Sequence, residues 1–251
     1  MSAPLAGRRA LVTGGGRGIG LAIARSLAAD GATLVLTGRN AERLDAAAEE
    51  LGATAQVLDM EDRGAIANGV AALGDIDILV NNAGVAVGAP LHRTDDATWD
   101  RVQQINVHGP YALMRALVPG MAKRGWGRVV NISSLAGLTG QAYTSAYCAS
   151  KHALIGLTRA LAVEYARAGV TVNAICPGWV ETDMARDAID RIARSTGRDE
   201  EAARDTLAGA SPQGRLVTAE EVAALTSMLC SEGARGIHGQ AIPVDGGTVM
   251  K

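Results

Sequence analysis

The 251-residue sequence contains no phenylalanine, and aromatic residues make up only 3% of it. Alanine and the aliphatic side chains must therefore build the core, and hydrophobic residues reach 48% of the chain. An excess of one charge is also lacking, because 24 Lys and Arg face 26 Asp and Glu. We therefore expect no nucleic-acid partner, since such a surface needs clustered basic residues.

Cysteine is scarce, with Cys148, Cys176 and Cys230 spaced widely along the chain. This odd number predicts free thiols in a reducing compartment and no disulfide or metal site, and the four histidines also lack ligand spacing. No hydrophobic run approaches the ~20 apolar residues of a membrane span, and the N-terminus has no signal-peptide pattern. These absences predict a cytoplasmic protein with no membrane partner and no metal.

Short β-branched runs alternate with longer Ala/Leu-rich stretches. This alternation predicts right-handed βαβ crossovers and a parallel sheet covered by helices on both faces. The expected fold is α/β, a single doubly wound Rossmann-type domain over residues 1–251 with a mostly seven-stranded parallel sheet flanked by helices. The expected strands are Arg9–Thr13, Thr33–Thr37, Ala55–Leu58, Ile76–Val80, Arg128–Ile132, Val170–Ala174 and Ala241–Val244. The expected helices are Ile19–Ala29, Ala41–Leu51, Arg63–Leu73, Asp96–Lys123, Ser145–Ala168 and Ala219–Leu229.

A charged, Ala-rich segment at residues 183–212 interrupts this pattern, and Asp183–Leu207 is predicted to be helical. It is either a surface insertion or a helical lid over the substrate.

The first expected strand runs into a glycine-rich turn, in which Gly14, Gly18 and Gly20 form the pattern G-x-x-x-G-x-G. Glycine lets a backbone turn tightly and approach a pyrophosphate closely, and the N-terminus of the next helix attracts the anion. No Gly-Lys-Ser/Thr follows, so the turn is not a P-loop. It predicts a dinucleotide site.

The residue that ends the second strand selects between the two nicotinamide cofactors. An Asp or Glu there would hold the ribose 2′-hydroxyl of NAD(H), but this chain has Gly38 and Arg39. Arg39 is placed to pair with a 2′-phosphate, and Arg17 in the glycine-rich turn offers a second cation. The sequence therefore favours NADP(H). NAD(H) remains an alternative, because Arg17 is compatible with either cofactor.

Tyr147 and Lys151 lie four residues apart in an expected helix, so the phenol and the ammonium share one face. The unperturbed pKa of tyrosine is ~10, and lowering it by ~3 units requires ~4 kcal/mol. A neighbouring ammonium and a positive nicotinamide ring would both favour the phenolate. The pair predicts an acid–base catalyst for a carbonyl/alcohol interconversion.

Two further polar residues belong to this pattern. Ser134 follows the fifth strand, at the sheet edge where ligands bind, and is placed to hydrogen-bond the substrate oxygen. Pro110 has no N–H to offer the Asn106 carbonyl four residues earlier. That carbonyl is expected to hold a water that relays protons to Lys151.

In their order along the chain these motifs resemble the short-chain dehydrogenase/reductase family, and in particular its 3-oxoacyl reductase-like members, essentially end to end. The resemblance implies a hydride transfer between a nicotinamide and a carbonyl or secondary alcohol. It implies a catalytic group of Asn106, Ser134, Tyr147 and Lys151. Together with Arg17 and Arg39, the implied cofactor-binding residues are Gly14, Gly18, Ile19, Gly20, Asp59, Met60, Asn82, Ala83, Gly84, Tyr147, Lys151, Pro177, Gly178, Val180 and Thr182. The family also implies a homotetramer that buries the outer faces of the helices near Asp96–Lys123 and Ser145–Ala168.

The substrate is left open. The chain resembles 3-oxoacyl and polyketide ketoreductases around Ser150–Met184, and gluconate 5-dehydrogenase-like members around Thr37–Asn40. A 3-oxoacyl thioester is the first hypothesis, and a sugar acid or cyclic alcohol is the alternative. The residues expected to line the substrate pocket are Ser134, Leu135, Leu138, Gln141, Tyr147 and Trp179.

Two other classes of protein fit the sequence less well. A non-catalytic NADP(H) sensor would have no need of the general acid Tyr147. A methyltransferase would want an acid after the second strand, where Gly38 and Arg39 stand.

Overall fold

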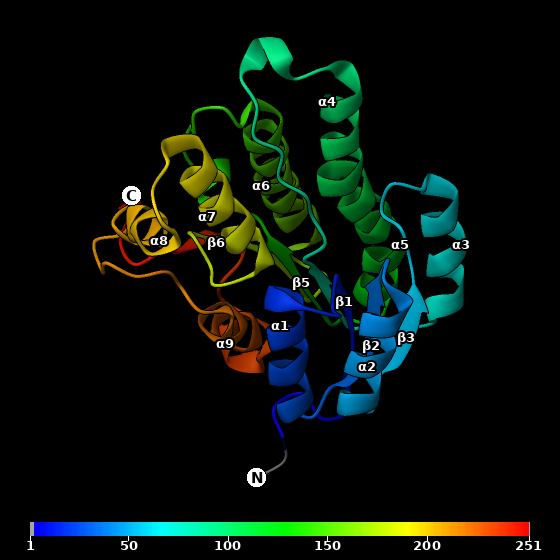
Figure 1. Cartoon of the computed structure of the whole chain (residues 1–251). Helices are drawn as coiled ribbons and strands as arrows, with labels where there is room; N and C mark the ends of the chain where they lie inside the picture. Colours follow the sequence, from blue (N-terminus) through cyan, green and yellow to red (C-terminus); the bar gives the residue numbers. More distant parts are fainter. Residues whose placement is uncertain (1–2, 251) are drawn as a thin grey trace.

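The computed structural model describes residues 3–250 (Figure 1). Seven parallel strands form one sheet in the order β3-β2-β1-β4-β5-β6-β7. The strands are β1 (Arg9–Thr13), β2 (Thr33–Gly38), β3 (Thr54–Val57), β4 (Ile78–Asn81), β5 (Gly127–Ile132), β6 (Val170–Pro177) and β7 (Ala241–Val244). The predicted α/β fold with a seven-stranded parallel sheet is confirmed.

Helices cover both faces of the sheet (Figure 1). The helices are α1 (Gly18–Ala29), α2 (Ala41–Leu51), α3 (Arg63–Leu73), α4 (Asp96–Gln103), α5 (Gly109–Lys123), α6 (Ser145–Tyr165), α7 (Asp183–Thr196), α8 (Glu200–Ala208) and α9 (Ala219–Cys230). Capping residues fix where several of these helices begin and end. Asn40 caps α2 by accepting a hydrogen bond from the Arg43 amide at 2.8 Å, and Gly52 ends α2 in the left-handed conformation.

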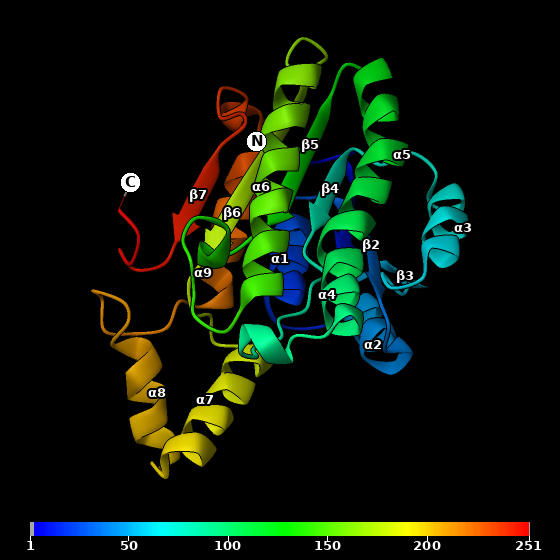
Figure 2. The same cartoon turned by 90° about the horizontal axis from the view of Figure 1, so that it is seen from above.

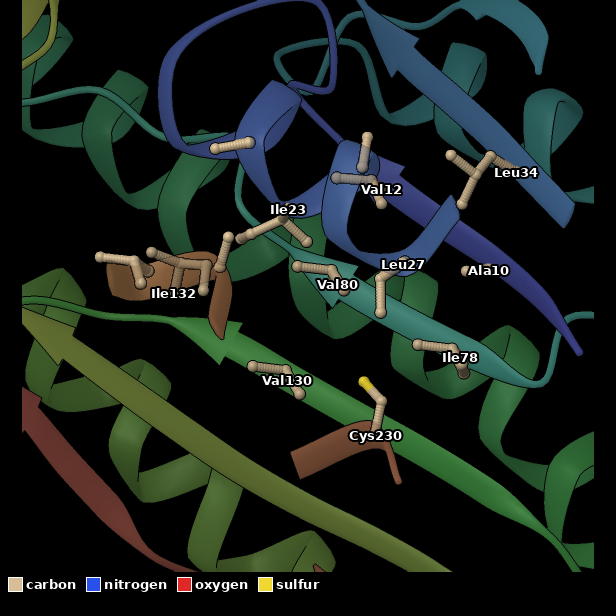
Figure 3. Close-up of a cluster of buried hydrophobic side chains, with 14 of the residues drawn as sticks. Ala10, Val12, Ile23, Leu27, Leu34, Ile78, Val80, Val130, Ile132 and Cys230 are labelled. Atoms are coloured by element: carbon tan, nitrogen blue, oxygen red, sulfur yellow. The ribbon is translucent and has the colours of Figure 1, made fainter. Parts of the chain in front are cut away.

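Alternate residues of each central strand enter two separate cores. On one face, β-strand residues such as Val80 and Val130 pack with Ile23 and Leu27 of α1 and Cys230 of α9 (Figure 3). On the other face the strands pack against α3, α5 and α6. The core residues on that face include Leu11, Leu79, Val129, Ile66, Leu113 and Met121. Side chains of alternating direction therefore lie in apolar surroundings on both sides, as a doubly covered sheet requires.

The helix expected over Asp96–Lys123 is interrupted. Between α4 and α5 the chain forms a π-helical turn over Gln104–His108, in which the Gly109 amide donates to the Gln104 carbonyl. Pro110 follows immediately, in the first turn of α5. A proline lacks the N–H that a regular helix needs here, so the wider turn is the local solution.

The polar segment after β6 also differs from its prediction. The expected helix over Asp183–Leu207 is two helices, α7 and α8, because Gly197 adopts a left-handed conformation with φ 69° and ends α7. Their apolar faces pack on each other through Ala188, Ile189, Ala203 and Leu207. Figure 2 shows the pair projecting from the body of the molecule, beside the end of β6.

Trp126 lies directly before β5, at the amino-end edge of the sheet. Two guanidiniums lie over its ring, with Arg8 3.8 Å and Arg128 4.3 Å from the ring centroid. Its indole nitrogen donates to Glu232 at 3.0 Å, and Glu232 also pairs with the buried Arg128. This cluster ties β5 to the turn after α9, far along the strands from the edge where the glycine-rich turn lies.

Candidate active site

A cavity of about 750 Å³ opens at the carboxyl ends of the strands. Segments that follow all seven strands contribute to it, which places it where open parallel sheets bind ligands. From β1 to β6 these loops contribute, among others, Gly14, Arg39, Asp59, Asn82, Ser134 and Gly178. The size matches sites for small molecules and cofactors.

The glycine-rich turn leaves a helix end free for an anion. Gly14 has φ 66°, a conformation that suits glycine. A Cβ on Gly20 would collide with the Gly14 carbonyl and come within 2.5 Å of the Asn82 amide nitrogen. The N-terminus of α1 has no side-chain cap and no acidic residue in its first turn. Its unpaired N–H groups and positive dipole end therefore fit the pyrophosphate of a dinucleotide.

Asn82 holds this turn in place from β4. Its side-chain nitrogen donates to the Thr13 carbonyl at 2.9 Å, and the Thr13 hydroxyl accepts from the amides of Asn82 and Ala83, both at 3.0 Å. Asn82, Ala83 and Gly84 all line the cavity. The turn and the end of β4 are thus one hydrogen-bonded unit.

The far side of the cavity carries several arginines. Arg39 and Arg17 both line it as predicted, and so does Arg43 of α2, which the sequence analysis missed. Arg43 lies in the first turn of α2, directly after the loop that carries Arg39, and this closeness in the sequence was the available signal. Each of the three is paired with an acid: Arg39 with Glu61 at 3.7 Å, and Arg17 and Arg43 with Asp183 at 2.7 Å and 3.8 Å.

Asp59 and Met60 follow β3 and also line the cavity. One Asp59 carboxylate oxygen accepts the Glu61 amide at 2.9 Å, so it shapes its own turn. Met60 is buried, and its carbonyl accepts from the Gln104 side chain at 3.2 Å.

Tyr147, Lys151 and Ser134 come together beside these loops. Tyr147 and Lys151 lie on the first turns of α6, with the Lys151 ammonium nitrogen 5.6 Å from the centroid of the Tyr147 ring. That nitrogen donates to the Ile132 carbonyl at 2.8 Å, which fixes Lys151 against the end of β5. Ser134 follows β5 and hydrogen-bonds with the Tyr147 hydroxyl. The three side chains line the same cavity.

Burial governs the proton affinities of this group. Desolvation raises the pKa of Tyr147, and the hydrogen bond with Ser134 opposes that rise. Burial also lowers the pKa of Lys151 to about 8. The lowering of the Tyr147 pKa expected from the neighbouring ammonium is therefore not found in the chain by itself: desolvation of the phenol has the largest effect, and Lys151 is not among the groups that shift this pKa.

Asn106 lies behind the cavity, not on its wall. Its side-chain oxygen accepts from the Val85 amide, and its nitrogen donates to the Val85 carbonyl, both at 2.9 Å. The same nitrogen donates to Ser150 at 3.0 Å, and the Ser150 hydroxyl donates to the Tyr147 carbonyl at 2.7 Å. The sequence analysis missed Ser150 and this side-chain role of Asn106. The role proposed for its carbonyl, holding a water, stays a prediction.

Residues after β6 close the cavity from the other side. Pro177, Gly178, Val180 and Thr182 all line it. Val180 forms a β-bridge with Val217. Thr182 precedes α7, and its methyl carbon lies 3.4 Å from the position that a Cβ on Gly18 would occupy. The segment after β6 thus lies directly over the glycine-rich turn.

Of the predicted substrate residues, Leu135, Gln141 and Trp179 line the cavity. Leu138 does not, because it packs against a small core of Ile155, Ala174 and Cys176. Many lining residues were not predicted, and they include Val85–Gly88 after β4 and residues of α7 and α8. The lid contributes Met184, Ala185, Asp187, Ala188, Arg191 and Leu207. Ile19 and Gly18 line the opposite wall. Residues of the segment 183–212 therefore line the cavity, and the role of this segment as a substrate lid stays a prediction.

Comparison with known proteins identifies the family. Residues 14–249 match a family model described as enoyl-(acyl carrier protein) reductase. A D-beta-hydroxybutyrate dehydrogenase of Cupriavidus necator is 38% identical over 98% of this chain and 100% of its own length. A 3-oxoacyl-[acyl-carrier-protein] reductase of Pseudomonas aeruginosa is 39% identical over 98% of this chain and 99% of its own. This chain belongs to the short-chain dehydrogenase/reductase family. It is an oxidoreductase that uses a nicotinamide cofactor and acts on a hydroxyl or carbonyl group.

Solved structures agree with this assignment. The actinorhodin polyketide ketoreductase, crystallised as a variant with NADPH, has a TM-score of 0.93 and is 37% identical over 99% of both chains. The L-sorbose reductase of Gluconobacter frateurii, complexed with NADPH and L-sorbose, has a TM-score of 0.92 and is 31% identical over 100% of both chains. Among residues 3–250 of the present family member, no helix has the length and apolarity to cross a membrane. No group of His, Cys, Asp and Glu within that range could hold a metal ion.

Proposed function

We propose that this enzyme is an NADP(H)-dependent reductase of 3-oxoacyl thioesters that also runs in the dehydrogenase direction on the 3-hydroxyacyl product. The observation that carries the proposal is the convergence of Ser134, Tyr147 and Lys151 on a cavity whose remaining wall near them is mostly apolar. That wall includes Val85, Ala86, Val87, Leu135, Met184, Ala188 and Leu207.

The chain's own residues supply the acid–base chemistry. When bound, the nicotinamide supplies the hydride. Tyr147 donates its phenolic proton to the ketone oxygen, and Ser134 donates a hydrogen bond to the same oxygen. Lys151, anchored at the Ile132 carbonyl, keeps a positive charge close to the Tyr147 ring and so offsets the cost of phenolate formation. Lys151 is buried, and Ser134 and Tyr147 are half-buried, so restricted access of water strengthens these interactions.

The preference for NADP(H) rests on the charges at the end of β2. Gly38 and Arg39 stand where a ribose-binding acid would favour NAD(H), and Arg17 and Arg43 line the same corner. Both solved structures named above hold NADPH. We expect Arg39→Asp to shift the ratio of kcat/KM values from NADPH toward NADH by at least about ten-fold. An unchanged ratio would show that Arg39 does not select the cofactor.

The choice of an acyl thioester follows from the shape and polarity of the substrate side. A polyol needs a hydrogen-bond partner for each hydroxyl, and an apolar wall leaves these groups unsatisfied. An acyl chain gains from the same wall, at about 25 cal/mol per Å² of apolar surface buried. Two of the relatives are named for a beta-hydroxybutyrate and for a 3-oxoacyl group as substrates. In both substrates the reacting oxygen and the acyl oxygen are in a 1,3 relation.

A sugar acid or cyclic alcohol is the second candidate. Gln141, Thr144, Asp187 and Arg191 also line the cavity and offer polar contacts to such a molecule. The structural similarity to an L-sorbose reductase supports it.

We further propose a homotetramer that works in the cytoplasm. Tyr111 on α5 and Val163 on α6 are 44% and 83% exposed, and both belong to the helices expected to meet between subunits. The three cysteines are free, as a reducing compartment permits.

The test is a comparison of Tyr147→Phe with Tyr165→Phe. Both tyrosines lie on α6, but Tyr165 is at the end distant from the cavity and does not line it. We expect Tyr147→Phe to lower kcat at least about 100-fold on a 3-oxoacyl thioester while the Kd for NADPH changes less than about three-fold. Tyr165→Phe should keep wild-type turnover. Full activity in Tyr147→Phe would contradict the assignment of Tyr147 as the acid. If the wild type bound NADPH but turned over no thioester, keto sugar or cyclic ketone, a non-catalytic NADP(H) sensor would be favoured.

A further inference from the structure

Asp183, the first residue of α7, is held by three arginines. Its Oδ2 atom lies 2.7 Å from Arg17 Nη1 and 3.8 Å from Arg43 Nη1. Its other oxygen accepts from Arg186, within the same helix, at 3.2 Å. Hydrogen bonding to Arg17 is the main cause that keeps the pKa of Asp183 below its usual value, so the carboxylate is charged at neutral pH.

Two of these arginines do not belong to the lid. Arg17 comes from the glycine-rich turn and Arg43 from α2, and both line the cavity beside Arg39. Asp183 therefore pairs with the same arginines that, in the proposed function, bind the 2′-phosphate of NADP(H). Glu61 pairs with Arg39 in a similar way, but it comes from the loop after β3 and not from the lid.

We propose that Asp183 is a cofactor-specificity residue that competes with the 2′-phosphate for Arg17 and Arg43. The carboxylate lowers the affinity for a 2′-phosphorylated nucleotide, and the phosphate in turn releases the N-terminus of α7 from the glycine-rich turn. This inference rests on the proposed use of NADP(H). It identifies Asp183 as a residue that weakens the preference for NADP(H), and it couples binding of the 2′-phosphate to the position of α7.

The coupling follows from charge and from linkage. The Asp183 carboxylate and a bound 2′-phosphate would accept hydrogen bonds from the same N–H groups of Arg17 and Arg43, so they cannot both be fully paired. An interaction that the phosphate must displace lowers its apparent affinity, and by reciprocity the bound phosphate weakens that interaction. The side chains of Arg17 and Asp183 are 62% and 44% exposed, so the effect is that of a surface pair. A pair of this kind corresponds to about a two- to five-fold change in Kd.

The binding experiment compares Asp183→Asn with Asp190→Asn by calorimetric titration. Asp190 lies on α7 too and pairs with Arg194 at 3.8 Å, but does not line the cavity, so its substitution removes the same charge without freeing Arg17 or Arg43. The probes are adenosine 2′,5′-bisphosphate and adenosine 5′-monophosphate. We expect Asp183→Asn to bind the bisphosphate about two- to five-fold tighter than wild type, with the monophosphate unchanged. Asp190→Asn should match wild type with both probes.

Hydrogen exchange of the α7 amides tests the link to the lid. Adding adenosine 2′,5′-bisphosphate to the wild type should speed exchange at the start of α7, whereas the monophosphate should not. In Asp183→Asn the same amides should exchange fast without any ligand.

The outcomes separate the two proposals. Equal or weaker binding of the bisphosphate to Asp183→Asn, or slower α7 exchange when it binds, overturns the competition while leaving NADP(H) use intact. If wild type binds the bisphosphate no more tightly than the monophosphate, the NADP(H) assignment fails, and the competition fails with it.

Discussion

The Asn106 side chain donates a hydrogen bond to the hydroxyl of Ser150 at 3.0 Å, and this contact joins the π-helical turn to the first turns of α6. Ser150 is fully buried and passes the connection on by donating to the Tyr147 carbonyl. The position of the proposed catalytic tyrosine is thus set by two side chains, Asn106 and Ser150, that do not themselves line the cavity.

Ser150→Ala should therefore lower kcat while leaving the Kd for NADPH nearly unchanged. The substitution leaves the Asn106 amide without one buried acceptor, which costs about 1–3 kcal/mol of unfolding free energy. We expect kcat to fall about ten-fold, as a small displacement of the acid allows. The control is Ser145→Ala on the same helix, since the buried Ser145 hydroxyl has no hydrogen-bond partner among the described residues. Wild-type kcat in Ser150→Ala would remove the positioning role.

The binding of NADPH should weaken as the pH rises through about 8, the pKa to which burial lowers Lys151. The cofactor ribose accepts hydrogen bonds, so binding favours the protonated ammonium, and the free enzyme loses that proton above its pKa. The measurement is the Kd for NADPH by fluorescence titration between pH 6 and pH 10, with about two points per pH unit around the Lys151 pKa. Lys151→Arg should give a flat profile, because a guanidinium stays charged. A flat wild-type profile would speak against a titrating Lys151.

Gly20→Ala should abolish dinucleotide binding. The new Cβ would collide with the Gly14 carbonyl and the Asn82 side chain, both parts of the anion-binding turn. We expect a loss of at least about 2 kcal/mol in unfolding free energy, measured by urea denaturation. Gly236→Ala is the matched control, because a Cβ there meets no atom within 4 Å. Normal NADPH binding by Gly20→Ala would mean that the turn can rearrange.

Glu221→Gln should destabilise the fold at neutral pH by about 1 kcal/mol, since Glu221 caps α9 and pairs with Arg215 on the surface. These contacts lower the pKa of Glu221 from 4.5 to about 2, chiefly through the hydrogen bond from Arg215. A lowered pKa contributes stability above the unfolded-state pKa and loses it as the pH falls toward the folded-state pKa. The difference between wild type and variant in thermal unfolding should therefore shrink between pH 4.5 and about 2. Glu220→Gln, next in the chain but outside the capping box, should show no such trend.

Much of the fold could be predicted because strand and helix periods are local properties of the sequence. β1, β4 and β5 each contain consecutive apolar residues, Ala10–Val12, Ile78–Val80 and Val129–Val130, which marks strands covered on both faces. The breaks were harder to predict. A single Gly197 within a polar, helix-favouring segment ends α7, and a glycine inside a helical pattern is often tolerated.

Parts of the candidate site depend on contacts between segments that are distant in sequence. Ser134 could be predicted because it follows a strand, and Tyr147 and Lys151 because they are spaced four residues apart in a helix. The ion pairs of Arg17 and Arg43 with Asp183 join residues on opposite sides of the cavity, and nothing local to any one of them indicates the others. The same holds for the Tyr147 pKa, because a helical spacing reveals the nearby ammonium but not the depth of burial.

The absence of phenylalanine and the placement of the tryptophans also give the protein a built-in optical probe. Trp179 lies on the cavity wall, 37% exposed, whereas Trp126 contacts two arginines at the amino-end edge of the sheet and Trp99 lies on α4, outside the cavity lining. A reduced nicotinamide absorbs where indole emits, so the light lost on cofactor binding should come mainly from Trp179. Trp99 and Trp126 would continue to emit as an internal reference, and a Trp179→Leu variant would show how much of the intensity change belongs to the cavity.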